Sequence, residues 1–193
     1  SDVEELAKYS DVPVINGLTD LEHPCQALAD VLTIKEHLGD WEGRKICFVG
    51  DGNNVSNSLL LIAPLLGMDM SLACPKGYEP CESILKTARE YAEEFNTEIT
   101  ITDDIGVALE NVDAVFTDVW VSMGDEAEKA QREIDFAPFQ VNNDLMSIAN
   151  EGAIFLHCLP AVRGQEVTAD VIDGPQSVVY DEAENRMHAQ KAL

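Results

Sequence analysis

The chain has 193 residues, 46% of them hydrophobic and 25% charged, which is enough for one sizeable domain with its own core. Its 36 acidic and 12 basic side chains give a formal net charge of −24 at pH 7, whereas a nucleic-acid-binding face would have to be basic. Because of this charge we expect no nucleic-acid partner. No apolar run approaches the roughly 18 residues that span a bilayer, so we expect no membrane contact. We also expect a cytoplasmic protein.

Short apolar runs alternate with amphipathic stretches along the chain. In chain order, this pattern predicts helices at 1–10, 24–38, 55–66, 80–95, 105–111, a short one ending at 149, 169–172 and 182–193. It predicts strands at 12–15, 45–49, 70–73, 99–102, 114–117, 153–156 and 177–180, and a charged, mobile segment at 122–133 that can close over a ligand. Strands and helices at this spacing predict an α/β fold, a three-layer, doubly wound parallel sheet of the Rossmann-like kind.

The strand at 45–49 stops at a Gly50-Asp51-Gly52 turn, and a helix follows at once. Ligands bind outside the carboxyl ends of the strands in such sheets. Three later predicted strands also end in polar or reactive residues, namely Asp118, His157 with Cys158, and Asp181 with Arg186 beyond it. We therefore expect the chemistry at this edge of the sheet.

The same turn invites a dinucleotide-binding interpretation, but the pattern disagrees with it at two positions. Val55 stands where the third glycine of the fingerprint belongs, and the next predicted strand ends in Ala73-Cys74-Pro75 without an acid for the ribose. The side chains of Asn53 and Asn54 instead offer amides that suit a small polar ligand.

The stretch His23-Pro24-Cys25-Gln26 opens a helix, and a helix N-terminus attracts anions and electron-rich oxygens. The alternative is a capping sequence with a buried Cys25. The carboxylate of Asp118 suits a substrate ammonium group, although an aspartate after a strand often caps a helix instead.

Two further candidates also have structural alternatives. His157 and Cys158 are adjacent on a strand and should point to opposite faces, so we expect Cys158 to line the site rather than to form a nucleophilic Cys–His pair. Arg186 follows several carboxylates and could form a surface ion pair. The five cysteines show no CxxC pair and no zinc-like spacing, which predicts reduced thiols and no metal site.

Together, HPCQ, GDGNN, D-x-W-x-SMG, HCLP and EAENR resemble, in this order and spacing, the motifs of the aspartate/ornithine carbamoyltransferase family. The resemblance covers essentially the whole chain, and the SMG element after Asp118 is similar to that of the ornithine-using members. It implies transfer of the carbamoyl group of carbamoyl phosphate to the δ-amine of L-ornithine, which gives citrulline and phosphate in arginine biosynthesis or in the arginine deiminase pathway. No metal or organic cofactor is implied.

The resemblance also assigns the site residues. The implied catalytic residues are His23, Asp118, Cys158 and Arg186. Carbamoyl phosphate is implied to bind at His23, Pro24, Cys25, Gln26, Cys158, Leu159 and Arg186, and ornithine at Asn54, Asp118, Ser122 and Met123.

The Ser-x-Arg-Thr-Arg element of the family's phosphate-binding half is absent from this sequence. The resemblance therefore implies a fragment of a two-domain enzyme, with residues 1–23 the remnant of the carbamoyl-phosphate-binding domain and residues 24–193 the ornithine-binding domain. Residues 24–38 would be the interdomain helix, and the closing helix would be truncated. We expect the isolated fragment to be inactive and the full-length enzyme to be a homotrimer or a higher homo-oligomer.

Two alternatives remain at this point: a carbamoyltransferase for another amine, such as putrescine or N-acetylornithine, and a non-catalytic amino-acid-binding module. The carboxylate excess is spread along well-patterned segments and only seven lysines occur, which favours a halophilic archaeal source over a merely soluble acidic enzyme.

Overall fold

Five parallel strands form one sheet in the computed structural model, which describes residues 2–121 and 126–193. They are β1 (Lys45–Val49), β2 (Asp69–Ala73), β3 (Ile99–Thr102), β4 (Ala114–Thr117) and β5 (Ile154–His157), in the spatial order β3-β2-β1-β4-β5. The order reverses between β1 and β4, which is the topological switch point of a doubly wound sheet. None of the helices in the described ranges is long and apolar enough to cross a membrane.

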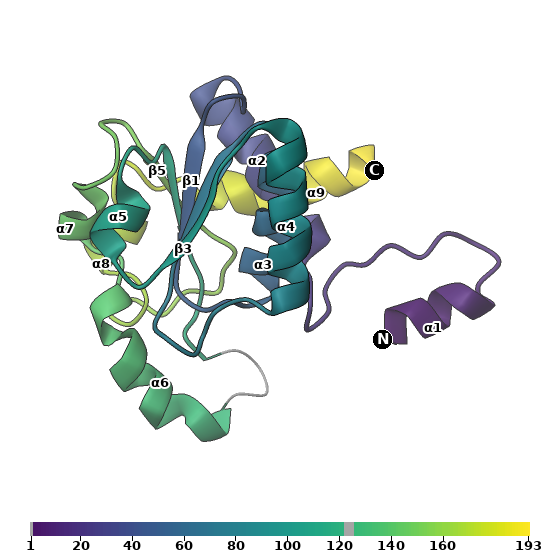
Figure 1. Ribbon diagram of the computed structural model, residues 1–193, viewed down its shortest axis with the longest axis horizontal. Helices are drawn as coiled ribbons and strands as arrows, with labels where there is room; N and C mark the ends of the chain where they lie inside the picture. The colour runs from purple at the N-terminus through teal and green to yellow at the C-terminus, as the bar shows by residue number, and fades with distance from the viewer. Residues whose placement is uncertain (1, 122–125) are drawn as a thin grey trace.

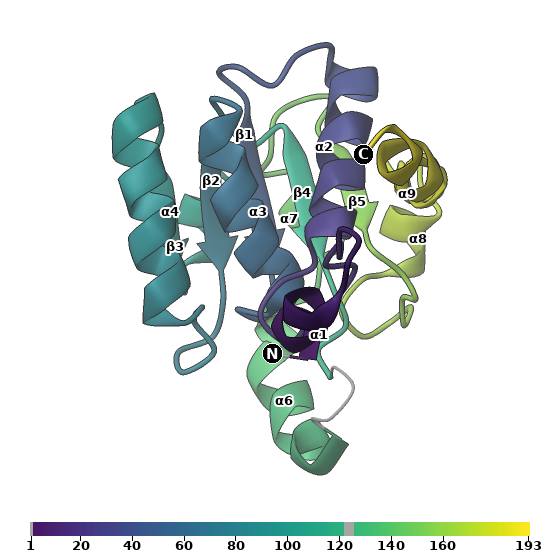
Figure 2. The same cartoon turned by 90° about the vertical axis from the view of Figure 1, so that its right-hand side faces the viewer.

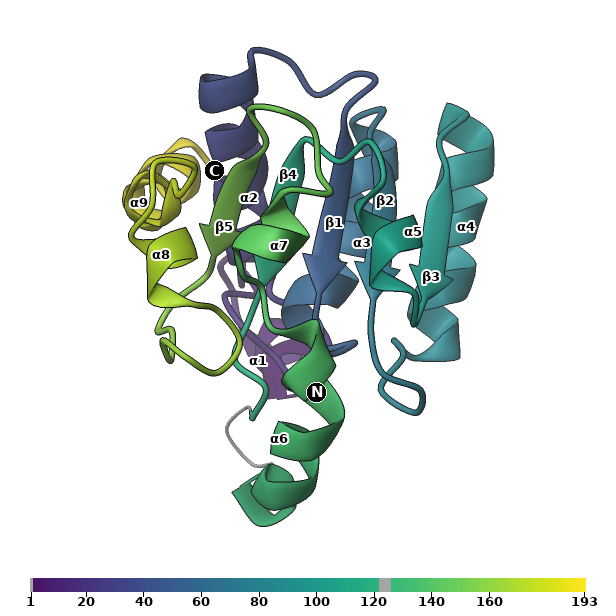
Figure 3. The same cartoon turned by 90° about the vertical axis from the view of Figure 1, so that its left-hand side faces the viewer.

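Helices cover both faces of this sheet, as Figure 1 shows with the sheet nearly edge-on. On one face lie α2 (Pro24–Leu38), α3 (Asn54–Leu65), α4 (Glu82–Phe95) and α9 (Val179–Ala192) (Figure 2). On the other lie α5 (Ile105–Leu109), α7 (Asn143–Met146) and α8 (Ala169–Ile172) (Figure 3). The prediction of a three-layer α/β fold with a parallel sheet is confirmed.

The strands are apolar on both sides because both sides are covered. Along β1, Phe48 packs into the core under α2, α3 and α4, whereas Cys47 and Val49 pack into the core under α5, α7 and α8. In β4, Phe116 packs into the first of these cores and Val115 into the second. Successive side chains of a strand thus enter opposite cores, and both cores are apolar. This explains why the strands appear in the sequence as continuous apolar runs rather than as alternating apolar and polar residues.

Two predicted strands are wrong. Residues 12–15 lie in backbone outside any strand, and Val12 and Ile15 are exposed. They belong to an arm that joins α1 (Asp2–Tyr9) to the domain and extends away from it (Figure 1). At 177–180, only Ser177 pairs with the sheet, through an isolated bridge to Phe155, and α9 begins at Val179.

Because α9 begins at Val179, Asp181 lies in a helix and not at the end of a strand. Its carboxylate is on α9 and contacts His37 Nε2 at 2.8 Å, where the side chains of His37 and Asp181 are 33% and 59% exposed. Asp181 therefore does not follow a strand. The carboxyl edge of the sheet carries three of the four predicted polar strand ends.

The charged segment expected to be mobile is partly helical. After the undescribed residues come a 3-10 turn (η1, Glu126–Glu128), α6 (Lys129–Phe136) and a second 3-10 turn (η2, Ala137–Phe139). Helix α6 projects beyond the carboxyl ends of the strands (Figure 3). It is held by Arg132, whose Nη1 donates to Asp51 at 2.6 Å and to the carbonyl oxygen of Trp120 at 3.1 Å.

Candidate active site

Asn53 and Asp118 meet at the switch point, where β1 and β4 end side by side. Asn53 is the N-cap of α3, and its Oδ1 accepts hydrogen bonds from the backbone nitrogens of Val55 and Ser56, each at 3.1 Å. Its Nδ2 donates to Asp118 Oδ2 at 2.8 Å. One side chain therefore both starts the helix and orients the carboxylate. Residues 119–121 are not helical, so Asp118 does not cap a helix directly after it.

Cys158 contributes the next group. Its Sγ donates to Asp118 Oδ1 at 3.2 Å. Burial first, and then the negative charge of Asp118, raise the pKa of this thiol well above its ordinary value. The group is therefore a neutral thiol at neutral pH, and a thiol is a poor nucleophile. This agrees with the interpretation of Cys158 as a lining residue.

The ring nitrogens of His157 bond to Leu159 and Glu166 rather than to Cys158, so His157 and Cys158 do not form a hydrogen-bonded nucleophilic pair. His157 Nδ1 accepts a hydrogen bond from the backbone nitrogen of Leu159 at 2.9 Å, which leaves the proton on Nε2. Nε2 contacts Glu166 Oε1 at 3.2 Å, and both side chains are completely buried. Leu159 has a φ of 57°, a left-handed conformation that is uncommon for leucine. The buried His157–Glu166 pair thus stabilises the turn that follows Cys158.

Gln26 and Arg186 form the second part of the site. Arg186 Nη1 donates to Gln26 Oε1 at 2.6 Å, from α9 to the first turn of α2. Within the described residues Arg186 makes no ion pair with a carboxylate, so the surface-pair alternative is wrong. A guanidinium beside a helix N-terminus is suited to polarising a carbonyl oxygen.

His23 lies immediately before α2, and its Nδ1 is buried without a hydrogen-bond partner in the described residues. Burial first, and then the positive charge of Arg186, lower its pKa, while Asp118 acts in the opposite direction. The imidazole is therefore neutral at pH 7. The two parts of the site are neighbours, because Glu182 accepts hydrogen bonds from Gln26 and from the backbone nitrogen of His157, the residue before Cys158.

Behind Gln26 lies a buried carboxyl pair that the sequence did not reveal. Gln26 Nε2 donates to Asp30 Oδ1 at 2.8 Å and to Glu182 Oε1 at 3.0 Å. Glu182 Oε2 accepts from the backbone nitrogen of His157 at 2.8 Å. Burial raises the pKa of Asp30 to about 7, and burial together with the charge of Asp30 raises the pKa of Glu182 well above its ordinary value. We infer that the pair keeps one shared proton at neutral pH.

This shared proton leads to a prediction about stability. In the unfolded chain Asp30 titrates near 3.8, whereas in the folded protein it titrates at about 7, so the folded state binds the proton more tightly. The free energy of unfolding should therefore decrease as pH rises from about 4 to 7. Urea unfolding of full-length protein at pH 5 and pH 8 should show a smaller decrease for Asp30→Asn than for the wild type. Equal decreases in the two proteins would contradict the shared proton.

Two other predicted site residues have their side chains directed elsewhere. Asn54 Nδ2 donates to the carbonyl oxygen of Thr19 at 2.7 Å, toward the N-terminal arm. Cys25 is buried, and its Sγ donates to the carbonyl oxygen of Asn16 at 3.5 Å. Pro24 occupies the first turn of α2. Ser122 and Met123 lie outside the described residues.

One group could in principle ligate a metal ion, because ligand atoms of Asp118, His157 and Cys158 lie within 4.8 Å of one another. Both ring nitrogens of His157 are already engaged, by Leu159 and Glu166, and the thiol is bonded to Asp118. A zinc site would also need the thiolate, whereas the pKa of Cys158 is raised. These residues do not fit a metal ligand set.

The GDG turn itself is shaped by close packing. The backbone nitrogen of Gly52 donates to the carbonyl oxygen of Tyr78 at 2.8 Å, and any side chain at position 52 would collide with the backbone of residues 78–80. Glycine is therefore required here by contact between two loops. The third-glycine position of the dinucleotide fingerprint holds the buried Val55.

Comparison with known proteins places this geometry in a family. Residues 42–193 match the family profile described as "Aspartate/ornithine carbamoyltransferase, Asp/Orn binding domain", and residues 1–36 match the "carbamoyl-P binding domain" of the same family. The chain is 74% identical to an ornithine carbamoyltransferase of Methanobrevibacter smithii over 192 residues, which are 100% of this chain and 64% of that protein.

Solved structures agree. The ornithine carbamoyltransferase of Pyrococcus furiosus superposes with a TM-score of 0.95 at 54% identity, over 99% of this chain and 61% of that one. An N-acetyl-L-ornithine transcarbamylase superposes with a TM-score of 0.88 at 36% identity, over 99% of this chain and 60% of that one. The sequence thus spans less than two thirds of these relatives. It belongs to the aspartate/ornithine carbamoyltransferase family.

Proposed function

We propose that the protein containing this chain transfers the carbamoyl group of carbamoyl phosphate to the δ-amine of L-ornithine, giving L-citrulline and phosphate. The observation that carries the proposal is the adjacency of two groups at one sheet edge. Asp118 and Cys158 are linked by a hydrogen bond, and Gln26 and Arg186 are linked by another. Glu182 connects the two groups, because it accepts from Gln26 and from the backbone nitrogen of His157. The first group suits an amine and the second a carbonyl.

In this proposal, Asp118 attracts the δ-ammonium group and accepts its proton. The free amine attacks the carbamoyl carbon, and the new C–N bond forms as electrons move onto the carbonyl oxygen. Arg186 and His23 stabilise this oxyanion, and Gln26 binds the carbamoyl amino group. The intermediate then expels phosphate, which leaves with the electrons of the broken C–O bond and takes up the second proton that the attacking nitrogen has to lose, so that the product is a neutral amide nitrogen. Holding the two substrates in line supplies much of the remaining acceleration.

The remaining assignments are part of the same proposal. Pro24, Cys25 and Leu159 complete the carbamoyl-phosphate site, and Asn54, Ser122 and Met123 complete the ornithine site. Residues 1–23 would belong to the carbamoyl-phosphate-binding domain and residues 24–193 to the ornithine-binding domain. We further propose a cytoplasmic enzyme that assembles as a trimer or a higher homo-oligomer.

The second candidate is a carbamoyltransferase for another amine, because one structural neighbour is titled an N-acetyl-L-ornithine transcarbamylase. The deciding experiment measures carbamoylated product formed by the full-length protein from ornithine, N-acetylornithine and putrescine. We expect citrulline from ornithine. Product from another amine alone would favour the second candidate, and no product from any amine would favour a non-catalytic binding module.

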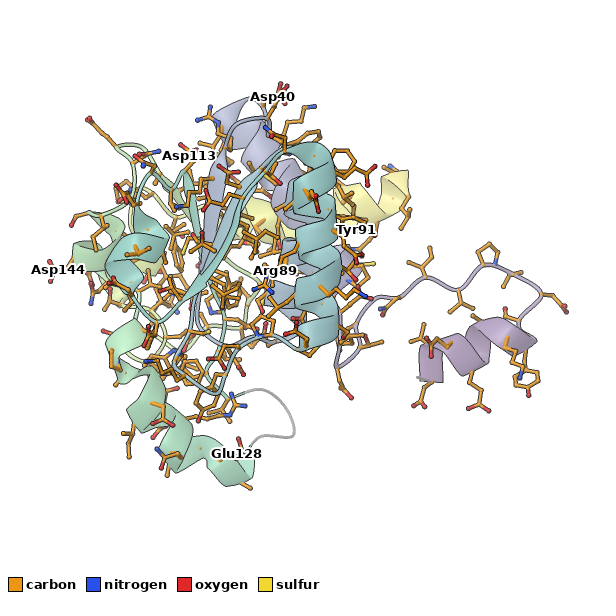
Figure 4. All side chains as sticks on the ribbon, viewed as in Figure 1. Asp40, Arg89, Tyr91, Asp113, Glu128 and Asp144 are labelled. Atoms are coloured by element: carbon orange, nitrogen blue, oxygen red, sulfur yellow. The ribbon has the colours of Figure 1, made fainter. Side chains whose placement is uncertain are left out.

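The charge distribution supports a salt-rich cytoplasm. The net charge is −24, and Figure 4 shows Asp40, Asp144 and Glu128 at three different margins of the molecule in this view. Their mutual repulsion acts over a Debye length of about 30 Å at 0.01 M salt but only about 3 Å at 1 M.

The melting temperature of the full-length protein should therefore rise steeply, by roughly 10 °C or more, between low and molar potassium chloride, because salt screens this repulsion. Differential scanning calorimetry across that range is the measurement. A melting temperature that stays constant across the salt series would argue against the halophilic origin.

A further inference from the structure

Gln26 is the only side chain in the described part of the site that is bonded to both an acid pair and a guanidinium. Its amide nitrogen has two hydrogens, and both are used, one by Asp30 at 2.8 Å and one by Glu182 at 3.0 Å. Its amide oxygen receives Arg186 Nη1 at 2.6 Å. A guanidinium can only donate, and a carboxyl oxygen that carries no proton can only accept. The reversed amide would therefore place donor against donor and acceptor against acceptor.

Burial of these polar groups lowers the stability of the folded protein. Asp30 is 0% exposed, Glu182 is 1% exposed and Gln26 is 1% exposed. Two carboxyl groups in the interior cost stability unless hydrogen bonds and opposite charges compensate for their desolvation. Two apolar side chains in place of Asp30 and Glu182 would join α2 to α9 without this desolvation penalty. The polar cluster therefore needs an explanation beyond packing.

The cluster also connects to the other part of the site. Glu182 Oε2 accepts the backbone N–H of His157, the residue before Cys158, at 2.8 Å. A single carboxyl group thus holds the amide of Gln26 with one oxygen and the end of β5 with the other. This fixes the position of the amide relative to the Asp118–Cys158 pair.

We propose that Asp30 and Glu182 are positioning residues that lock the side-chain amide of Gln26, so that its oxygen rather than its NH₂ group faces the ligand. The inference rests on the proposed function, because an outward amide oxygen selects a carbonyl compound that carries an N–H donor. Carbamoyl phosphate has this donor and acetyl phosphate has a methyl group in its place. Asp30 and Glu182 would thereby determine the discrimination between the two.

The test uses the full-length protein and needs no amine substrate. Calorimetric titration gives the dissociation constants of carbamoyl phosphate and acetyl phosphate, and their ratio measures discrimination. Glu182→Met keeps the volume of the side chain but removes both of its acceptor oxygens, so that only Asp30 and Arg186 still hold the amide of Gln26 and its orientation is less well fixed. We expect the ratio to fall about tenfold or more, the effect of losing one oriented hydrogen bond to the ligand.

Glu182→Gln provides a second, milder variant in case Glu182→Met does not fold. Gln26 and the backbone nitrogen of His157 bond to different oxygens of Glu182, so glutamine would place an NH₂ donor against one of these two donors. We therefore expect a fall of several-fold. The matched control is Thr33→Val in the same interface between α2 and α9. Thr33 is buried and its Oγ1 accepts from Asn185 Nδ2 at 2.9 Å, away from Gln26. This control should lower the melting temperature and leave the ratio unchanged.

The outcomes separate this inference from the proposed function. A folded Glu182 variant that keeps the wild-type ratio would overturn the positioning role, as would an equal fall in Thr33→Val. Failure of the wild type to bind carbamoyl phosphate would overturn both. A third outcome is that the wild type binds carbamoyl phosphate tightly and the variants show a reduced ratio, but no citrulline forms from ornithine. This outcome would reject only the proposed amine substrate, and it would support the positioning of Gln26 by Asp30 and Glu182.

Discussion

Asp118→Asn in the full-length protein is expected to lower kcat by about 100- to 1,000-fold, corresponding to roughly 3–4 kcal/mol of transition-state stabilisation. The carboxylate would lose its charge and with it the ability to accept the proton of the ornithine amine. Asparagine has the same shape, so the oxygen atom it retains can still accept from Asn53 or Cys158, which now donate to the two carboxylate oxygens. Steady-state kinetics with ornithine, together with the melting temperature, would measure the effect.

Asp113→Asn is the matched control at the opposite end of the same strand. Asp113 also accepts hydrogen bonds, from the backbone nitrogen of Lys45 at 3.1 Å and from Asn150 Nδ2 at 3.0 Å, but it lies far from the carboxyl edge. Its substitution should leave kcat close to the wild-type value. If Asp118→Asn also turned over normally, the carboxylate would have no chemical role and the proposed mechanism would be wrong.

Arg132→Met is expected to lower the free energy of unfolding by about 3–5 kcal/mol, the range for breaking a buried ion pair from one side. The guanidinium is 9% exposed and lies 2.6 Å from Asp51, whose side chain is 14% exposed. It also lies over the ring of Tyr78, with 5.2 Å between the guanidinium carbon and the ring centroid. Methionine retains most of the packing but leaves the carboxylate of the GDG turn without this close cation.

Arg163→Met tests whether burial rather than ion pairing is responsible. Arg163 makes a two-point contact with Asp173 at 2.7 and 2.9 Å, yet the two side chains are 45% and 49% exposed. Exposed ion pairs contribute little to stability because water and salt screen them, so this variant should unfold at nearly the wild-type urea concentration. Equal destabilisation by the two substitutions would show that the burial of Arg132 has no special importance.

The sheet could be predicted from sequence because each of its five strands is a short apolar run that ends at a turn or at a polar residue. The run Ser177-Val178-Val179-Tyr180 has the same local character, yet it starts a helix after one bridge to β5. Local β-propensity cannot distinguish these cases, because tertiary contacts decide them. Residues 12–15 have the same local character, and they lie outside the sheet.

The site was predictable in part. Asp118 and Cys158 directly follow strands and Gln26 lies in the first turn of α2, and such positions can be predicted from the chain. Arg186 lies inside α9 and is indicated only by its motif. Asp30 and Glu182 were not found, because each is an acid within a helix that otherwise resembles a solvated surface position. Their role depends on a contact between distant segments. For Asn53 a local signal existed, since asparagine is a preferred N-cap.

Asn53 both caps α3 and holds Asp118, and these two roles restrict how the protein can be engineered for heat resistance. A routine strategy replaces a helix cap with serine, threonine or aspartate, which bind the first amides about as well. At position 53, serine or threonine would remove the amide donor that holds Asp118, and aspartate would place a second carboxylate against it. Efforts to raise thermal tolerance should therefore leave this cap unchanged and seek gains at exposed helix ends, such as the Cys81 cap of α4, which makes no side-chain cap bond.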